Sequence, residues 1–478
     1  MRTLTAGACQ YARRMEENSD WAAPAATGPL RGLARVPGSK SMTNRALVLA
    51  VLATGPTRIT GPLVARDTLL MAGALRALGA TIETDGGADQ GTAGQGSTDR
   101  GSTDRGSTGQ PVWRVQPGQA AGDAAVDVGN AGTVLRFVPP VAALTSADVA
   151  FSGDRRAAQR PVGPLLAGLR ELGAVIDDDG RGAVPFTVRG RGGLTGGSVT
   201  LDASGSSQLV SGLLLAAPRY DKGVEIRHEG APVPSAPHIA MTVQMLRAAG
   251  AQVTAQTGRG DGTGGRNPVL PSWTVQPGAL APGAIEIEPD LSNAAPFLAA
   301  ALVAGGSVTI PDWPARSLQA AGQILDVLTA MGARCTLGGD GLTLTGSGVI
   351  RGVSADLGDI GELTPVLTAL AALASSPSEF TGVGHLRAHE SNRLAALAGE
   401  IGALGGDVSE LPDGLRIVPR PLRAGSASFA TYDDHRLVMA AAVLGLAVPG
   451  LRVANASTVG KTFPGFLDQW GQLLERSG

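Results

Sequence analysis

The sequence predicts an α/β protein that is built from repeated copies of one small subdomain. One short pattern occurs five times: an apolar helical run ends, a Gly follows, and a β-prone segment begins. Gly directly after the last helical residue is a common C-cap, because it adopts a positive φ without strain. Each copy therefore predicts a helix that leads into a strand. The copies lie at residues 75–80, 169–174, 246–251, 328–333 and 401–406.

A second pattern lies between these copies and predicts where further helices begin. Asp or Ser with Gly or Asn precedes a segment rich in Ala and Leu, and the spacing of about 70 to 95 residues indicates repeats of a whole subdomain. Such side chains are good N-caps. Several helix N-termini that meet at one place would also attract an anion, and the two interpretations are compatible. The segments are Asp127–Thr133, Asp202–Gln208, Pro289–Asn293, Asp356–Glu362 and Asp433–Arg436.

The composition is that of a globular protein with two or three domains. Of the 478 residues, 43% are apolar and 17% are charged, and the net charge of -2 excludes a broad basic face for nucleic acid or anionic membrane. Cys9 and Cys335 offer neither a disulfide framework nor a thiolate metal site. The sequence has no apolar run of membrane-spanning length and no secretory signal, so we expect a cytoplasmic protein.

Three segments are expected to be flexible. Residues 1–28 form an N-terminal extension, residues 86–110 contain a tandem Gly-Ser-Thr-Asp-Arg repeat, and residues 256–268 are rich in Gly with alternating charge. Segments of this composition cannot bury enough apolar surface to form a core.

Lysine is scarce in this chain, which draws attention to the few positions that keep it. Among 39 basic residues only Lys40, Lys222 and Lys461 are lysines. An ammonium group is a compact point charge for phosphate or carboxylate and can exchange a proton, which a guanidinium cannot. Lys222 lies in a Tyr-Asp-Lys-Gly segment, which predicts an ordinary surface turn. Lys40 and Lys461 are therefore candidate anion ligands.

Two strings combine several chemically useful side chains. After Lys40, the residues Ser41 and Arg45 lie one helical turn apart, so an ammonium, a hydroxyl and a guanidinium can surround a small anion. The alternative is a capped helix with surface charges. The string Arg387–Leu394 places His389 and Glu390 as an acid/base pair at the start of a helix.

Other interpretations of this second string stay open. Its His389 stands four residues after His385, so a zinc site with Glu390 is conceivable, although the Glu does not lie between the two His as it does in metalloproteases. A solvated helix start is the other alternative. The basic run Asp154–Pro161 and the segment Asp433–Arg436 would each, taken alone, be typical of a solvated face.

Taken together, these strings resemble one family, the 3-phosphoshikimate 1-carboxyvinyltransferases or EPSP synthases. The resemblance extends over residues 37 to 464, and its strings follow one another in the family's order. They are Pro37–Arg45, Gly129–Thr133 with Arg136, Gly153–Asp154 with Arg160–Pro161, Ser206–Gln208, Ser235–Pro237, Glu390–Arg393, Asp434–Arg436 and Lys461–Pro464.

The resemblance implies a fold of two pseudo-symmetric domains that close on the ligands. Each domain would contain three repeats of a βαβαββ-type unit, the enolpyruvyl transferase fold, which is similar to an inverse α/β barrel. The first domain would comprise residues 29–38 and 287–478, and the second residues 39–286. The family members are expected to act as monomers.

The resemblance also implies an activity and a set of site residues. The enolpyruvyl group of phosphoenolpyruvate would move to the 5-hydroxyl of shikimate 3-phosphate on the route to chorismate and the aromatic amino acids, with release of phosphate and without a metal or organic cofactor. Shikimate 3-phosphate would contact Lys40, Ser41, Arg45, Ser206, Ser207, Gln208, Ser235, Glu362 and His389. Phosphoenolpyruvate would contact Lys40, Asn130, Gly132, Arg160, Gln208, Arg393, Arg436 and Lys461. The catalytic groups would be Glu362, Glu390, Lys40, Lys461 and His389.

Four positions depart from the family's usual residues. Glu362 stands where the family has a proton-accepting Asp, His389 where most members have Lys, and Asn392 where Asp is usual, for which we expect a supporting hydrogen-bond role. Phe137 follows Arg136 where Pro is common. Two alternatives remain: a catalytically silent protein that binds the same ligands, and an enolpyruvyl transferase that acts on UDP-N-acetylglucosamine.

Overall fold

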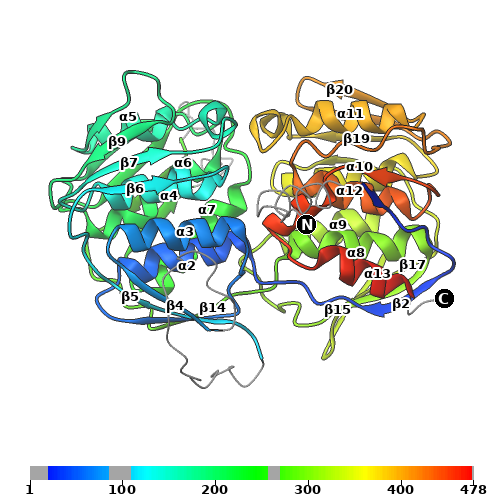
Figure 1. Ribbon diagram of the computed structural model, residues 1–478, viewed down its shortest axis with the longest axis horizontal. Coiled ribbons are helices and arrows are strands. Elements are labelled where there is room, and N and C mark those ends of the chain that lie inside the picture. Colours follow the sequence, from blue (N-terminus) through cyan, green and yellow to red (C-terminus); the bar gives the residue numbers. More distant parts are fainter. Residues whose placement is uncertain (1–19, 86–108, 257–269, 476–478) are drawn as a thin grey trace, which may run out of the picture. The chain divides into compact units, whose positions relative to one another are not determined.

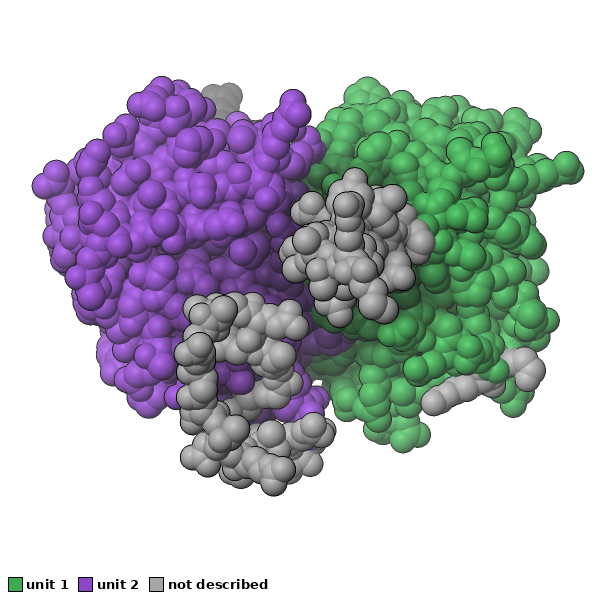
Figure 2. All heavy atoms as spheres, viewed as in Figure 1, with its two compact units in different colours: residues 1–36, 289–478 green, residues 37–288 purple. Residues whose placement is uncertain are grey.

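The chain folds into two compact units that alternate along the sequence (Figure 2). The computed structural model describes residues 20–85, 109–256 and 270–475. Unit 1 takes the chain up to Val36 and again from Pro289, and unit 2 takes Pro37–Glu288.

Unit 2 contains three four-stranded sheets of one topology (Figure 1). In each sheet the first two strands are parallel, and the last two pair antiparallel as a hairpin. In order across each sheet, the strands are β14 (Ala284–Glu286), β3 (Thr57–Thr60), β5 (Val112–Gln116) and β4 (Thr81–Asp85); β6 (Ala124–Asp127), β7 (Asp148–Ser152), β9 (Phe186–Arg189) and β8 (Val175–Asp177); β10 (Gly197–Leu201), β11 (Val224–His228), β13 (Ser272–Val275) and β12 (Val253–Gln256).

Two helices accompany each of these sheets, which completes a βαβαββ subdomain. They are α2 (Lys40–Val51) with α3 (Arg66–Ala77), α4 (Gly132–Ala142) with α5 (Gly163–Glu171), and α6 (Ser207–Ala216) with α7 (Ala236–Ala248). Short 3₁₀ turns lie at η1 (Ala157–Gln159) and η2 (Ala217–Arg219). In the first subdomain the outer parallel strand, β14, comes from the far end of the unit's sequence.

Unit 1 repeats this topology twice. Its four-stranded sheets are β2 (Leu30–Leu33), β15 (Gly306–Ile310), β17 (Gly341–Gly346) and β16 (Arg334–Gly338), and β18 (Ser354–Asp356), β19 (Ser378–Thr381), β21 (Gly414–Val418) and β20 (Asp407–Leu411). The helices are α8 (Leu291–Ala304), α9 (Ala321–Ala330), α10 (Thr364–Ala372), α11 (Arg393–Ala403), α12 (His435–Gly445) and α13 (Phe466–Glu475), with 3₁₀ turns at η3 (Gly361–Leu363), η4 (Gly384–Ala388) and η5 (Ala456–Lys461).

The third subdomain of unit 1 is reduced. Among the described residues, α12 and α13 are accompanied by the two-stranded pair β1 (Trp21–Ala22) and β22 (Arg452–Val453), with one isolated parallel bridge from Phe429 to Val453. The predicted three equal repeats are therefore present in unit 2, whereas the third repeat of unit 1 keeps its helices and loses most of its sheet.

The core of each unit is formed by helices that are apolar on every side. All residues of α4 and α12 are buried, and α8 is buried from Leu291 to Leu302 apart from Ser292. A helix with no polar face is stable only when other elements surround it. The N-terminal turns of these helices are the exception, because they carry the polar side chains of the site.

The glycines of the first pattern lie where they are predicted, and a helix follows each segment of the second pattern, but Asp127, Asp202 and Asp356 are not the N-caps of these helices. The five glycines that follow a helix adopt positive φ angles between 90° and 115°: Gly79, Gly173, Gly250, Gly332 and Gly405. In three of these subdomains an Asp at the end of the first parallel strand accepts a hydrogen bond of 2.8 Å from the backbone N–H two residues later. These are Asp127, Asp202 and Asp356. The recurring bond turns the chain from strand into helix at equivalent positions.

The flexible segments need one correction. Residues 20–28 belong to unit 1, because Trp21 pairs with Val453 and Ala23 is only 5% exposed. Trp21 and Ala23 are thus packed into unit 1, so the predicted flexible extension does not reach residue 28. Residues 1–19, 86–108 and 257–268 of the predicted flexible segments lie outside the described residues.

The C-cap glycines provide a stability test with an internal control. At Gly79 a Cβ would overlap the backbone of Gln119 and Ala120, and φ is +99°, so Gly79→Ala should lower the free energy of unfolding by at least about 1 kcal/mol. Gly73 lies inside α3 with open space around it. Gly73→Ala should raise stability by about 0.5 to 1 kcal/mol because Ala is the better helix former. Urea unfolding measures both, and equal effects of the two changes would contradict the assignment.

Candidate functional site

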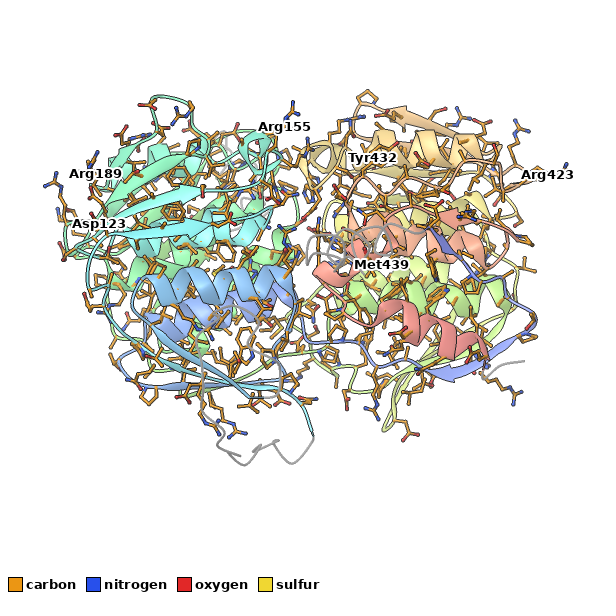
Figure 3. All side chains as sticks on the ribbon, in the orientation of Figure 1. Asp123, Arg155, Arg189, Arg423, Tyr432 and Met439 are labelled. Carbon is orange, nitrogen blue, oxygen red and sulfur yellow. The ribbon has the colours of Figure 1, made fainter. Side chains whose placement is uncertain are left out.

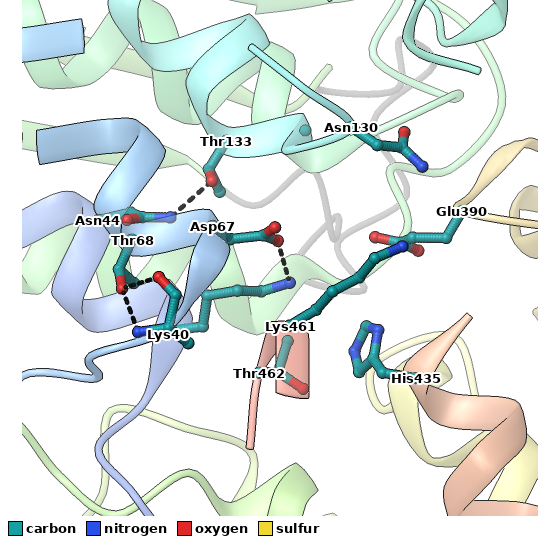
Figure 4. Close-up of polar contacts among 12 residues, drawn as sticks. Lys40, Asn44, Asp67, Thr68, Asn130, Thr133, Glu390, His435, Lys461 and Thr462 are labelled. Carbon is teal, nitrogen blue, oxygen red and sulfur yellow. Dashed lines mark hydrogen bonds and ion pairs between the residues drawn. The ribbon is translucent and has the colours of Figure 1, made fainter. Parts of the chain in front are cut away.

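In unit 2, the first turn of α2 carries Lys40 next to a carboxylate. Ser39 caps the helix, and the Lys40 Nζ lies 3.2 Å from Asp67 Oδ2 in the first turn of α3 (Figure 4). Both side chains are largely buried, with 18% and 13% exposed. Asp67 therefore fixes the position of the ammonium group. The sequence analysis did not select Asp67, since a single Asp in a helix start resembles any N-terminal acid.

Arg45 is enclosed by protein rather than pointing into solvent. Its guanidinium donates to Thr242 Oγ1 (2.7 Å), to Ser211 Oγ (3.2 Å) and to the carbonyls of Ser41 and His238. Burial lowers the pKa of Arg45 to about 9. Arg45 therefore connects α2 with α6 and α7, and a ligand would have to replace one of these partners to bind it directly.

The start of α4 brings two arginines against one glycine. Arg160 donates to the carbonyl of Asn130 (2.7 Å), and Arg136 donates to the carbonyl of Pro161 and to Gln208 Oε1. A Cβ at Gly132 would lie 2.5 Å from Arg160 Nη2 and 2.9 Å from Arg136 Nη1. A side chain at this position would therefore displace one or both guanidinium groups from their present hydrogen bonds.

One buried polar atom at this place has no partner among the described residues. The Asn130 side-chain oxygen is buried and accepts no hydrogen bond from the described part of the chain. Buried polar atoms are nearly always paired in native structures, so an orphan atom indicates a position that a ligand or water completes. Its neighbourhood agrees with a ligand site, because Arg160 is only 5% exposed and lies beside it.

The predicted serine residues stand at two helix starts of unit 2. Ser206 is the N-cap of α6 and accepts from the Gln208 N–H, while Ser207 begins the helix. Ser235 precedes α7 in the left-handed region with φ of 53°. Gln208 is held by Arg136, as described above. The Arg136–Gln208 bond thus connects the N-terminal parts of α4 and α6 in unit 2.

The basic run Asp154–Pro161 divides into a solvated and a buried part. Arg155 is exposed at the surface of unit 2 (Figure 3), and Arg66 pairs with Asp154 at a surface position. Arg160 alone turns inward. Of the run, therefore, only this last arginine belongs to the site.

In unit 1, Arg393 is the centre of the charged cluster. Its side chain is fully buried, and its five N–H groups face Asp434, Glu362, Glu390 and His389. The distances are 2.8 and 3.2 Å to Asp434, 3.0 Å to Glu362 Oε2 and 2.9 Å to Glu390 Oε2. Burial alone would lower the pKa of Arg393, but the three carboxylates raise it well above its usual value.

Asp434 is the anchor of this cluster. It is fully buried, caps α12 by accepting from the Arg436 N–H (2.9 Å), and also accepts from Ser391 Oγ (2.9 Å). These bonds hold residues 389–392 as a turn, so the prediction that His389 and Glu390 open a helix is wrong: α11 begins at Arg393, and Asn392 caps it. The expected supporting role of Asn392 is this cap.

The charge state of Glu362 follows from two arginines. Burial opposes ionisation, but Arg393 and Arg436 outweigh it and hold the pKa of Glu362 well below its usual value. Arg436 Nε lies 3.4 Å from Glu362 Oε2. The Glu362 side chain is still 30% exposed, so it is the carboxylate of the cluster most open to a ligand. Its ionised form can accept a proton.

His389 is neutral in this surrounding. Burial and the neighbouring Arg393 lower the pKa of His389 to about 3. Its Nδ1 accepts a hydrogen bond from Arg393 (3.3 Å), which places the ring proton on Nε2. The ring stacks edge to face on His385 at 5.4 Å. His389 can orient or exchange a proton, but it adds no positive charge at neutral pH.

The two other cations of the candidate site in unit 1 are Arg436 at the start of α12 and Lys461 at the end of η5. Arg436 donates to Ser292 Oγ (2.6 Å) and to Asn293 Oδ1 (3.2 Å), and Lys461 Nζ donates to the Asp433 carbonyl (2.6 Å). The N-termini of α8, α11 and α12 and the turn η3 thus meet through side-chain bonds. In the described ranges, no group of three or more His, Cys, Asp or Glu side chains is placed to hold a metal ion.

Comparisons with known proteins agree with the sequence resemblance. A family model described as EPSP synthase (3-phosphoshikimate 1-carboxyvinyltransferase) matches residues 24–470. A 3-phosphoshikimate 1-carboxyvinyltransferase from Kocuria rhizophila is 47% identical over 461 residues, which cover 96% of this chain and 97% of that protein.

Solved structures of similar fold come from Acinetobacter baumannii. Two EPSP synthase structures match with a TM-score of 0.71 at 24% and 23% identity, covering 96% of this chain and 98% of each of those chains. At this identity the match shows the fold. In the described residues, no helix has the length and apolar content needed to cross a membrane.

Loss of the buried carboxylate that faces Arg393 should destabilise unit 1 strongly. Asp434→Asn removes a fully buried charge that Arg393 faces, and should lower the free energy of unfolding by about 3 kcal/mol. Asp407→Asn is the matched control, because Asp407 pairs with Arg420 at 3.3 Å on the surface and should cost no more than about 1 kcal/mol. Equal losses for the two variants in denaturant unfolding would show that burial does not set the strength of the pair.

His389 gives a prediction for pH dependence. Because its pKa is lowered from 6.5 to about 3, the unfolded chain binds a proton below about pH 6.5 that the folded chain does not. Its contribution to stability should therefore fall as the pH falls from 6.5 towards 3. The His389 ring resonances, assigned with His389→Gln, should stay at their neutral positions from about pH 5 to about pH 8. A titration midpoint near 6.5 would refute this environment.

Proposed function

The chain belongs to the EPSP synthase family, and on that premise we propose that it transfers the enolpyruvyl group of phosphoenolpyruvate to the 5-hydroxyl of shikimate 3-phosphate and releases inorganic phosphate. The observation that carries the proposal is the family match over residues 24–470, whose polar strings coincide with the buried clusters at the helix starts. The reaction belongs to the shikimate pathway, which leads to the aromatic amino acids.

We assign the ligands of both substrates from the clusters of the two units. Shikimate 3-phosphate contacts residues of both units. They are Lys40, Ser41, Arg45, Ser206, Ser207, Gln208 and Ser235 of unit 2 and Glu362 and His389 of unit 1. Phosphoenolpyruvate contacts residues of both units. They are Lys40, Asn130, Gly132, Arg160 and Gln208 of unit 2 and Arg393, Arg436 and Lys461 of unit 1. The orphan amide oxygen of Asn130 and the glycine that leaves room between Arg136 and Arg160 support this assignment.

The first step is an addition. The 5-hydroxyl oxygen attacks the central carbon of phosphoenolpyruvate while a proton is added to its methylene carbon, which gives a tetrahedral intermediate that carries the phosphate. Glu362 accepts the proton of the hydroxyl, because it is ionised and is the most exposed carboxylate of its cluster. Glu390 and Lys461 are the candidate groups that donate the proton to the methylene carbon and remove a proton from the resulting methyl group. Binding of an anion at Arg393 and Arg436 weakens their hold on Glu362 and raises its basicity.

The second step is an elimination. The bond between the central carbon and the phosphate oxygen breaks, a proton leaves the methyl group, and the enol ether product forms. Charge gathers on the departing phosphate, and fixed cations stabilise it. Arg436, which is 4% exposed and already oriented by Ser292 and Asn293, requires little rearrangement to do so.

We also propose that the protein acts as a cytoplasmic monomer. Its composition and its membership in this biosynthetic family support the proposal. Sedimentation of the purified chain tests the oligomeric state.

Phosphate release tests the activity and the role of Glu362 together. Release should require both substrates, and Glu362→Gln should lower kcat by about 100-fold or more, because the amide cannot accept the hydroxyl proton. Glu379→Gln, an exposed residue of β19, should leave kcat unchanged. Binding of both ligands without release of phosphate would instead identify a silent binding protein.

A further inference from the structure

The first turn of α8 contains a buried amide side chain, Asn293, that connects Arg436 with the chain segment next to Lys461. Asn293 is 0% exposed, and its side-chain oxygen accepts from Arg436 Nη1 at 3.2 Å. Its side-chain nitrogen donates to the Thr462 carbonyl at 3.1 Å, directly after Lys461. One side chain thus contacts both the Arg436 guanidinium and the segment that carries Lys461.

The partners determine the orientation of this amide without ambiguity. A guanidinium can only donate and a carbonyl oxygen can only accept, so the oxygen must face Arg436 and the nitrogen must face Thr462. An amide is the one common side chain of this size that offers a donor and an acceptor in a single plane. Aspartate would set a carboxylate oxygen against the Thr462 carbonyl and would neutralise Arg436, and alanine would leave both partners unsatisfied in a buried place.

Neighbouring residues of α8 reinforce this connection. Ser292 Oγ accepts from Arg436 Nη2 at 2.6 Å and donates to Asp290 Oδ1 at 2.6 Å. One turn further along, the Phe297 ring packs against Phe463 with centroids 5.8 Å apart. The Lys461 segment is therefore fixed on two successive turns of α8, by a hydrogen bond and by an aromatic contact.

We propose that Asn293 is a positioning residue that sets the placement of Arg436 relative to Lys461 and so determines the affinity for phosphoenolpyruvate. The proposal rests on the function proposed above, in which both cations bind this substrate. Asn293 makes no contact with the reacting atoms. Its effect passes through the two hydrogen bonds, while Ser292 contributes through Arg436 alone.

The test measures the dissociation constant of phosphoenolpyruvate by calorimetry in the presence of shikimate 3-phosphate, together with the kinetic constants. Asn293→Asp should weaken phosphoenolpyruvate binding by about tenfold or more, and Asn293→Ala by somewhat less, because the aspartate also neutralises Arg436. The KM for shikimate 3-phosphate should change less than about twofold. Ser292→Ala, which leaves the Thr462 bond intact, should give the smallest loss.

Ser378→Ala is the matched control for a loss of packing or of a single buried bond. Ser378, the first residue of β19, is 2% exposed, and its Oγ accepts a hydrogen bond from the Val353 N–H. This variant should lower the thermal midpoint and leave both affinities unchanged. If the Asn293 variants change neither affinity, or change both equally, the positioning role is overturned.

The two proposals can fail separately. If the wild-type chain binds phosphoenolpyruvate but releases no phosphate, the transferase activity is overturned, and the calorimetric series still decides the role of Asn293. If the wild-type chain does not bind phosphoenolpyruvate at all, both proposals are overturned.

Discussion

The site in unit 1 depends on one fully buried and fully satisfied guanidinium, that of Arg393. Its five N–H groups are all used by three carboxylates and one imidazole nitrogen, so the desolvation of the charge is offset by hydrogen bonds on every side. This network sets the ionised state of Glu362 and the neutral state of His389. Any anion that Arg393 binds must compete with a carboxylate that is already in place.

The repeated subdomain explains why so many polar groups gather at helix starts. Each βαβαββ copy turns from strand to helix at an equivalent point, and the helices that follow are apolar along the rest of their length. In α4, α8 and α12 the polar side chains lie in or next to the first turn, where caps such as Asp434 and Asp290 also bind neighbouring residues. Repetition of the subdomain thus supplies several helix N-termini, each with a positive partial charge from the helix dipole, while few polar groups are buried elsewhere in these helices.

Much of the fold could be predicted because local chemistry determines it. The C-cap glycines and the Asp turns each require one residue type at one spacing, and they appear at the expected positions. The reduced third repeat of unit 1 was not predictable, because the missing hairpin leaves no local signal. Nor were Asp67 and Asn293, whose roles depend on partners far away in the sequence, 27 residues for Lys40 and 143 for Arg436. The helix start at His389 was wrongly predicted because a distant carboxylate, Asp434, holds that segment in a turn.

The central claim is that the chain breaks the carbon–oxygen bond of phosphoenolpyruvate after adding an alcohol to its central carbon. Phosphoenolpyruvate that carries ¹⁸O in the bridging position tests this claim most directly. With shikimate 3-phosphate present, the account predicts that the label leaves with inorganic phosphate, as mass spectrometry or ³¹P NMR would detect. Label retained in pyruvate, with unlabelled phosphate, would mean that water attacks phosphorus and would contradict the account.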